Sequence, residues 1–447
     1  MKKIKLLLPV WLVLLYFGSI FYMIQTRTEK RDQYQELVSQ AREYASNEVV
    51  TDAVATYEQA LKVHPNLQLC LETGEMLLEQ EDYADANKWY TNHLYANYPD
   101  EEQTYLYGIH MSFAKEDYSQ AFKIYEECRK RELNTAEIED LMKPVLYSYV
   151  LSGSYEEVQP FGNLSGIAAV KYNENWGYIN TDGQRVLDYI YISAGMFGDV
   201  AAVTDQNGET YFVDMNGNKK ITDLSVLSKD PELGQVKQFL GIDSGKLWAF
   251  NGQYWNCYDA ETCGKLFGGY TAVTSITNGI CAVQNGTGKW AILSEDGKEL
   301  TEYKYEAVLT DQKQVFSRTN AVLVKEDGQV WLVDQSGNHI SAQSYEDGCA
   351  FYDNTCAAVK QNGKWSYVDQ EGNEQDLGSY DEAQSFSNGL AAVKMNGKWG
   401  YINQNGELVI ECQFEQAGPF AASGVAFVKP DADGYWNLLS LYKNNHN

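Results

Sequence analysis

The side chains that most often perform catalysis are few in this sequence and form no recognisable pattern. The histidines stand at His64, His93, His110, His339 and His446. No H-E-x-x-H motif, nucleophile elbow, phosphate-binding loop or catalytic-triad order can be read in the chain. Acidic pairs such as Asp381-Glu382 occur, but a chain with 62 Asp and Glu residues contains such pairs by chance. We therefore predict no catalytic residue, no cofactor and no metal ligand.

Oxygen-rich turns are the feature that comes nearest to a metal site. Asp431-Ala432-Asp433-Gly434 looks like the start of a calcium loop, but the oxygen ligands that must follow, usually ending in a Glu, are missing. An Asp or Asn side chain that hydrogen-bonds to its own turn, followed by a glycine, explains the same pattern. We favour the turn and predict no calcium site.

The charge of the chain argues against nucleic-acid binding. Lys and Arg number 35 against 62 Asp and Glu, for a formal net charge of −27 and a pI near 4.5. A protein that binds nucleic acid needs a positive surface to replace the counterions of the phosphates. We therefore expect no nucleic-acid partner.

Aromatic residues carry the strongest signal, and residues 386–411 show it best. This stretch reads FSNGLAAVKMNGKWGYINQNGELVIE and predicts three short strands, Leu390–Lys394, Trp399–Asn403 and Leu408–Ile410. Asn-Gly pairs separate them, and Asn-Gly tolerates the positive φ angles of tight hairpins. Because so small a meander cannot bury its own apolar face, it needs neighbouring units.

The position of Trp399 recurs along the second half of the chain, at intervals of 34 to 45 residues. Its equivalents are Trp176, Trp255, Trp290, Trp365 and Trp436, with degenerate copies at Thr210 and Val330. In two copies a glycine follows, at Gly177 and Gly400. A fixed period of this length is typical of repeat architectures.

These motifs resemble the WG-repeat (KWG-repeat) family over about residues 158–447, in about eight copies. The resemblance implies a bacterial repeat scaffold and no particular reaction. Units of three to four antiparallel strands that lean on their neighbours predict a β-propeller-like array. An open β-superhelix of the same units is the alternative.

A membrane anchor is predicted at the N-terminus. Residues 1–5 are short and basic, and residues 6–24 form an uncharged, mainly apolar run long enough to cross a bilayer. No A-x-A-like cleavage site follows, so we predict a single-pass signal anchor. The three leading lysines favour an inside N-terminus, which places the rest of the chain in an extracytoplasmic location at the cell membrane.

Residues 33–157 are poor in glycine, and their apolar residues recur at helical spacing. Small residues and aromatic residues stand at the positions where paired helices would pack against each other. A last helix is expected at about Thr135–Leu151. The packing positions are Ala53, Tyr57, Ala60, Pro65, Gly74, Ala86, Tyr90, Gly108, Ala121 and Tyr125. This spacing resembles the tetratricopeptide repeat, with Pro99 one residue late in the second copy. It implies an α-solenoid, and a generic helical-hairpin domain is the alternative.

The cysteines are interpreted as buried apolar residues. None of the eight forms a C-x-x-C pair, and Cys281 and Cys356 stand where other repeats carry alanine. A disulfide between Cys257 and Cys263 across one hairpin is the alternative. Free thiols are uncommon outside the cytoplasm, which counts against the predicted location.

The predicted overall architecture is therefore multidomain, α-helical and then all-β. We expect a membrane-anchored, non-catalytic interaction scaffold that binds a protein or peptide, or an envelope glycan, through its two repeat domains. The alternatives are a cell-envelope enzyme that acts on glycan and a passive structural spacer.

Overall fold

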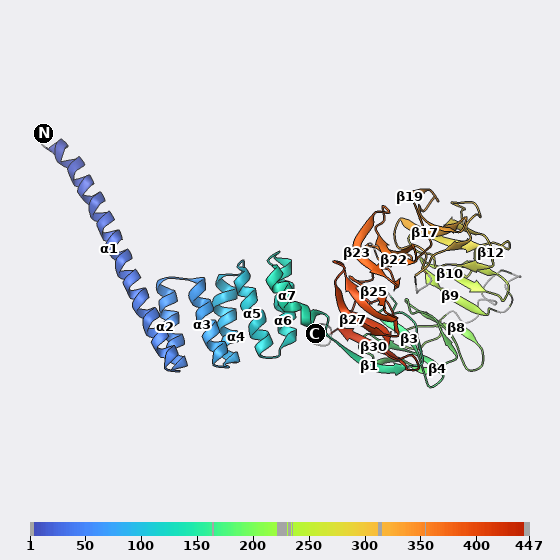
Figure 1. Ribbon diagram of the computed structural model, residues 1–447, viewed down its shortest axis with the longest axis horizontal. Helices are drawn as coiled ribbons and strands as arrows, with labels where there is room; N and C mark the ends of the chain where they lie inside the picture. Colours follow the sequence, from blue (N-terminus) through green and yellow to red (C-terminus); the bar gives the residue numbers. More distant parts are fainter. Residues whose placement is uncertain are drawn as a thin grey trace. The chain divides into compact units, whose positions relative to one another are not determined.

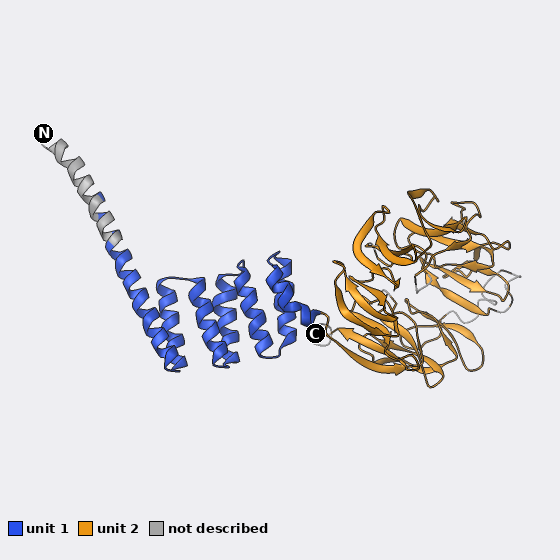
Figure 2. Cartoon of the chain, in the orientation of Figure 1, with its two compact units in different colours: residues 1–146, 446–447 blue, residues 147–445 orange. Residues whose placement is uncertain are grey.

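A computed structural model describes residues 4–162, 165–220, 230, 234, 236–311, 315–353 and 355–441. The chain divides into two compact units, Met1–Leu146 with His446–Asn447, and Tyr147–Asn445 (Figure 2). The first unit is helical and the second consists of antiparallel strands (Figure 1).

The helical unit is a row of paired helices. They are α1 (Ile4–Ser46), α2 (Val50–Val63), α3 (Leu67–Glu79), α4 (Tyr83–Trp89), the π-helix η1 (Tyr90–Tyr95), α5 (Glu102–Ala114), α6 (Tyr118–Lys130) and α7 (Ala136–Leu146). Asn66, Asp82 and Asp117 begin three of them, since each side chain accepts a hydrogen bond from a backbone N–H of the first turn.

The predicted transmembrane helix at residues 6–24 is wrong. Within the described residues, no helix is both long and apolar enough to cross a membrane. The apolar run is the beginning of the 43-residue helix α1, whose later turns carry charges such as Arg27, Lys30 and Asp32. Of the predicted span, Tyr16 and Met23 are described and are exposed; most other side chains, and residues 1–3, lie outside the described residues. The predicted extracytoplasmic location stays untested.

Glycines let neighbouring helices approach each other in the helical unit. A Cβ atom on Gly74 would lie 2.7 Å from the Tyr107 ring, and one on Gly108 would lie 2.8 Å from the Tyr90 ring. The Tyr107 hydroxyl also donates a hydrogen bond of 3.1 Å to the carbonyl oxygen of Gly74. Both positions thus need glycine, because a tyrosine ring occupies the space that a side chain would fill.

Replacing Gly108 with alanine is expected to destabilise the helical unit. The added methyl group has to displace the Tyr90 ring or Ile124, which should lower the free energy of unfolding by about 1–3 kcal/mol. Urea denaturation followed by circular dichroism measures this change. The exposed His110→Ala on the same helix is the control, and equal stability of the two variants would contradict the expectation.

A π-helical turn accounts for the late position of Pro99. The second helix of this pair continues from α4 into η1, where one extra residue is accommodated per turn. This insertion displaces everything after Tyr90 by one residue relative to the other pairs. The sequence spacing showed the displacement, but not its cause.

The described residues of the second unit form eight antiparallel sheets, here called blades 1 to 8 in chain order. Blade 1 contains β2 (Glu157–Val158), β3 (Ile167–Tyr172), β4 (Asn175–Asn180) and β5 (Arg185–Tyr191). Blade 2 contains β6 (Ser193–Ala194), β7 (Ala201–Thr204) and β8 (Thr210–Val213). Blade 3 contains β9 (Gln238–Asp243), β10 (Lys246–Phe250), β11 (Trp255–Asp259) and β12 (Lys265–Tyr270). Blade 4 contains β13 (Ala272–Val273), β14 (Ile280–Gln284) and β15 (Trp290–Ser294).

The second half of the unit follows the same plan. Blade 5 contains β16 (Ala307–Val308), β17 (Ala321–Glu326), β18 (Gln329–Asp334) and β19 (His339–Tyr345). Blade 6 contains β20 (Asp347–Gly348), β21 (Ala357–Gln361), β22 (Lys364–Val368) and β23 (Glu374–Tyr380). Blade 7 contains β24 (Glu382–Ala383), β25 (Leu390–Met395), β26 (Lys398–Asn403) and β27 (Leu408–Phe414). Blade 8 contains β28 (Gln416–Ala417), β29 (Val425–Lys429), β30 (Trp436–Leu441) and β1 (Tyr149–Tyr155).

Strand β1 closes the eight blades into a ring. It comes before blade 1 in the sequence but pairs antiparallel with β30 in blade 8, with Leu151 opposite Leu439 (Figure 1). A buried apolar cluster then joins blade 8 to blade 1 through Phe427, Phe161 and Val170. The predicted propeller is therefore closed, and the open superhelix is excluded.

The first residues of this closing strand were predicted to be helical. Helix α7 ends at Leu146, whereas the sequence analysis extended the last helix to Leu151 and began the β-repeats at residue 158. Tyr149–Tyr155 is a strand because it pairs antiparallel with β30. Such long-range pairing leaves no periodic signal in the local sequence.

A buried tyrosine makes the same contact between three pairs of successive blades. Tyr178, Tyr367 and Tyr401 are fully buried, and their hydroxyls donate to carbonyl oxygens 17 residues later, on Gly195 (2.9 Å), Gln384 (3.1 Å) and Gly418 (2.9 Å). Each ring also packs on a phenylalanine two residues beyond that carbonyl, with ring centroids 4.8–5.0 Å apart. The tyrosine two residues after the repeat tryptophan is thus the residue that joins one blade to the next.

Candidate functional site

The tryptophans that mark the repeats are not exposed. Trp176 and Trp365 are buried, and the rest of the set is partly buried, namely Trp255, Trp290, Trp399 and Trp436. The large aromatic side chains that are exposed in the described part of the propeller are instead Tyr172, Tyr254 and Tyr435. The tryptophans therefore offer no open aromatic platform.

The glycines after the tryptophans lie where a neighbouring strand comes too close for a side chain. A Cβ atom on Gly400 would be 2.4 Å from the carbonyl oxygen of Ile410, and one on Gly177 would be 2.9 Å from that of Leu187. At Gly400 the pairing register shifts between Trp399 and Tyr401. The glycine thus permits a β-bulge.

Most of the helical packing residues are buried between helices. This holds for Ala53, Tyr57, Ala60, Ala86, Tyr90, Ala121 and Tyr125, while Pro65 is exposed after the end of α2. The Tyr57 hydroxyl donates to Glu72, which also accepts two 2.7 Å hydrogen bonds from Arg42. These contacts connect the first helix pair to α3.

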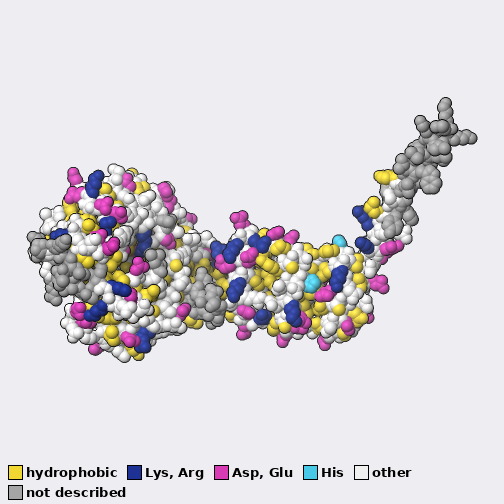
Figure 3. All heavy atoms as spheres, turned by 180° about the vertical axis from the view of Figure 1, so that it is seen from behind, with side chains coloured by type: hydrophobic (Ala, Val, Ile, Leu, Met, Phe, Trp, Pro, Cys, Tyr) yellow, Lys and Arg dark blue, Asp and Glu magenta, His cyan; other side chains and the backbone are white. Residues whose placement is uncertain are grey.

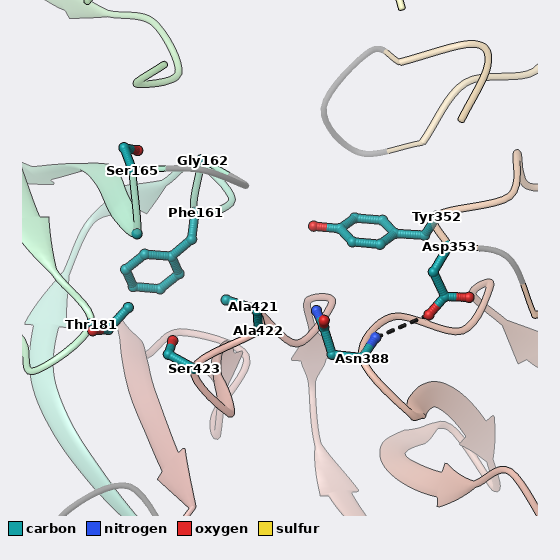
Figure 4. Close-up of a pocket in the computed structure, with 11 residues that line it drawn as sticks. Phe161, Gly162, Ser165, Thr181, Tyr352, Asp353, Asn388, Ala421, Ala422 and Ser423 are labelled. Atoms are coloured by element: carbon teal, nitrogen blue, oxygen red, sulfur yellow. Dashed lines mark hydrogen bonds between the residues drawn. The ribbon is translucent and has the colours of Figure 1, made fainter. Parts of the chain in front are cut away.

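Residues that follow the first strands of several blades line the same two cavities, and the space that these cavities occupy is here called the channel. One cavity, the mouth cavity, has a volume of about 470 Å³ and lies between the loops of blades 1, 6, 7 and 8 (Figure 4). Its polar lining residues are Ser165, Thr181, Tyr352, Asp353, Asn388 and Ser423.

The polar groups of the mouth cavity connect one blade to the next. Asp353 accepts a hydrogen bond of 3.1 Å from the backbone N–H of Asn388, as Figure 4 shows. The Asn388 amide donates in turn to the carbonyl oxygen of Phe420 at 2.7 Å, and Ser165 donates to that of Phe197 at 2.9 Å. These hydrogen bonds join neighbouring blades, and this structural role is enough to explain the polar side chains.

A charged group lies beside the mouth cavity. The Arg318 guanidinium donates to the Asp311 carboxylate at 2.9 and 3.0 Å and lies 4.9 Å from the centroid of the Tyr352 ring. The Arg318 and Asp311 side chains are only 16% and 4% exposed. Burial raises the pKa of Tyr352 to about 12, so this ring is neutral at physiological pH.

Stability is expected to depend on pH through Asp243, the last residue of β9. Burial raises the pKa of its carboxyl to about 6, although the charge of Arg318 opposes the shift. Because a buried carboxyl with a raised pKa destabilises the fold once it ionises, stability should fall as the pH rises from about 4 to about 6. Asp243→Asn should remove this step and stabilise the protein at pH 7 by on the order of 1 kcal/mol.

Urea denaturation at pH 4.5 and pH 7 measures the effect. The exposed Asp199→Asn is the control, since it removes the same formal charge without changing a buried group. If the stability of Asp243→Asn keeps the pH dependence of the unaltered chain between those values, Asp243 is not the group responsible.

A second cavity, the tryptophan pocket, is lined by residues at or just after the first strands of blades 5 to 8, and by Trp365 of β22 and Trp399 of β26. Its volume is about 300 Å³. Trp365, Trp399, Tyr352, Cys349, Ala350, Ala383 and Pro419 form its apolar walls, and Thr310, Asp311, Glu382, Gln384 and Ser385 are its polar residues. A cavity of this size with aromatic walls is typical of ligand-binding sites.

The cysteines form no disulfide, and five of the eight are buried. Cys257 and Cys263 are therefore not cross-linked. Burial raises the pKa of Cys257, Cys281 and Cys349 to about 12. Since the thiolate is the reactive form, these thiols should react slowly.

The oxygen-rich turns are used within the fold. Asp214, Asp334 and Asp369 each accept hydrogen bonds from backbone N–H groups two and four residues later, at 2.8–3.0 Å. In the parts of the chain that the structure describes, no group of three or more His, Cys, Asp and Glu side chains is arranged to hold a metal ion.

Charged side chains of both signs are spread over the propeller, and hydrophobic ones gather on the helical unit (Figure 3).

The sequence analysis singled out none of the residues that distinguish the channel, such as Arg318, Tyr352 and Asn388. A signal for them was present. The repeats agree in their strands but differ in the loop after the first strand, which reads PFGN, FYDNT, FSNG or FAASG. Variation at one point of an otherwise regular repeat marks a loop that can acquire a specific task.

The chain was compared with known proteins. No curated protein matches it in sequence. Among solved structures it is similar to the computationally designed Ika8 protein, with 14% identity over 65% of this chain and 98% of that chain and a TM-score of 0.44. It is also similar to BamB from Moraxella catarrhalis (12% identity, 67% and 98% covered, TM-score 0.41) and to the WD40 β-propeller domain of Doa1 (12%, 66% and 98%, TM-score 0.33).

A family model described as the WG containing repeat matches residues 379–399 and 399–436. These residues include blade 7 and, of blade 8, β28, β29 and the first residue of β30. The tetratricopeptide resemblance of the helical unit stays a prediction. For residues 379–436, the predicted identity is confirmed: this part of the chain consists of WG-type repeats.

Proposed function

We propose that this protein is a non-catalytic interaction scaffold that binds a protein or peptide segment through the channel of its propeller. The observation that carries the proposal is the tryptophan pocket, a cavity of about 300 Å³ with aromatic walls in a closed ring. Pockets of this kind hold the large apolar side chains that dominate the binding energy of protein interfaces.

The chemistry of the channel supports binding rather than catalysis. A general acid or base has to reach the substrate with a free proton-transfer position. Asp311, Glu382 and Asp353 instead face Arg318, Lys394 and the Asn388 backbone, respectively. The carboxylates in the cavities are thus occupied in holding the fold together.

Selection from a library of short random peptides tests the proposal. The full chain is expected to enrich peptides that bind it saturably and do not bind the heat-unfolded chain. If no such peptide is found, or if the purified chain turns over an envelope glycan, the proposal is wrong.

A further inference from the structure

We infer that the tryptophan pocket, lined by Trp365, Trp399, Cys349 and Pro419, receives one bulky apolar side chain of a partner peptide, and that basic residues flank this anchor. The inference rests on the proposed function and specifies its site and ligand. Four consecutive blades contribute to the pocket, so its shape depends on how these blades pack together.

The polar groups in the pocket are already satisfied. The Ser385 hydroxyl donates to the carbonyl oxygen of Cys349 at 3.1 Å and accepts from the N–H of Ala358 at 3.0 Å. The Gln384 amide donates to the carbonyl oxygen of Ala417 at 2.9 Å. An occupant therefore gains most from the apolar walls, and burying polar groups there would leave them without partners.

A charged anchor fits the pocket poorly, whichever its sign. Lys394 lies 5.7 Å from the centroid of the Trp399 ring and 2.6 Å from Glu382, so a second ammonium group would meet a positive charge at the same ring. A carboxylate would lose its hydration against the apolar walls, and the cations Arg318 and Lys394 are already paired with Asp311 and Glu382. A neutral aromatic or large aliphatic side chain avoids both costs.

Charge outside the pocket selects the flanking residues. The chain carries a formal net charge of −27, and the Glu382 side chain at the pocket is 51% exposed. A surface with this excess of carboxylates attracts basic peptides and repels acidic ones, and salt weakens the attraction. The expected ligand is thus an apolar anchor between lysines or arginines.

Peptides selected against the full chain from a library of short random sequences provide the probes. We expect the selected peptides to share a bulky apolar residue next to Lys or Arg. Thr310→Trp places an indole in the pocket, and Thr181→Trp makes the same change in the mouth cavity as a matched control, since both threonines are partly exposed.

Thr310→Trp should weaken binding of the strongest selected peptide by about tenfold to a hundredfold, the value of one buried apolar side chain. Thr181→Trp should bind like the unaltered chain, and thermal unfolding checks that both variants fold. Equal affinity of Thr310→Trp and the unaltered chain would overturn the inference, as would peptides enriched in acidic residues.

A measurement on the unaltered chain avoids any effect of substitution on folding. The anchor residue of the peptide is replaced with a photo-reactive benzophenone amino acid, and the cross-linked residues are identified by mass spectrometry. Attachment at Cys349, Trp399 or Pro419 supports the inference. Attachment only in the mouth cavity or on the helical unit overturns it but leaves the proposed function standing, whereas a library without binders ends both.

Discussion

Replacing Tyr401 with alanine is expected to lower the free energy of unfolding by about 3–5 kcal/mol. The Tyr401 ring is fully buried between blades 7 and 8, where it packs 4.8 Å from the Phe420 ring and against Ile410. Its hydroxyl donates to the carbonyl oxygen of Gly418 at 2.9 Å. The substitution opens a cavity at the interface between two blades of the closed propeller. Chemical denaturation measures the resulting fall in the free energy of unfolding.

Two further variants separate the ring from the hydroxyl. Tyr401→Phe keeps the packing and leaves the Gly418 carbonyl without its donor, so it should cost about 1–2 kcal/mol. Tyr435→Ala is the control, since Tyr435 is 57% exposed, and should change stability by less than about 0.5 kcal/mol. If Tyr401→Ala and Tyr435→Ala unfold alike, Tyr401 does not join the blades as described.

Replacing Gly400 with alanine is expected to destabilise the propeller by on the order of 3 kcal/mol. The new Cβ atom would lie 2.4 Å from the carbonyl oxygen of Ile410 and 2.7 Å from the backbone nitrogen of Cys412. Because both are backbone atoms, no side-chain rotation can relieve the clash, and β27 has to move away from β26.

Gly286→Ala is the matched control for this prediction. A Cβ atom on Gly286 would meet nothing within 4 Å, and this glycine has no positive φ. Its replacement should leave stability unchanged or raise it slightly, since alanine restricts the unfolded chain. Comparable melting temperatures for the two alanine variants would show that the bulge at Gly400 is not needed.

The sequence predicted the repeating contacts well because they recur. Trp399 and its equivalents revealed the period of the repeat. The sequence did not indicate that Tyr401, rather than Trp399, is the fully buried member. The alternation of side chains along a strand shows on which face each one lies, whereas the extent of its burial depends on the neighbouring blade.

The remaining errors concern contacts between distant residues. Strand β1 pairs with β30, nearly 300 residues later in the chain, and local periodicity cannot reveal such pairing. The N-terminal apolar run was judged by its own length and lack of charge, although it continues into the charged turns of α1. The tryptophan pocket likewise brings together residues that lie far apart in the chain, because blades 5 to 8 contribute to it.

Hydrogen–deuterium exchange of the full chain, with and without a saturating selected peptide, tests most directly whether the channel of the propeller is the binding site. We expect slower exchange in the segments 349–352 and 382–385, which contain residues that line the tryptophan pocket, and unchanged exchange in helices α2 to α6. Slower exchange confined to the helical unit or to the outer strands of the blades would contradict it.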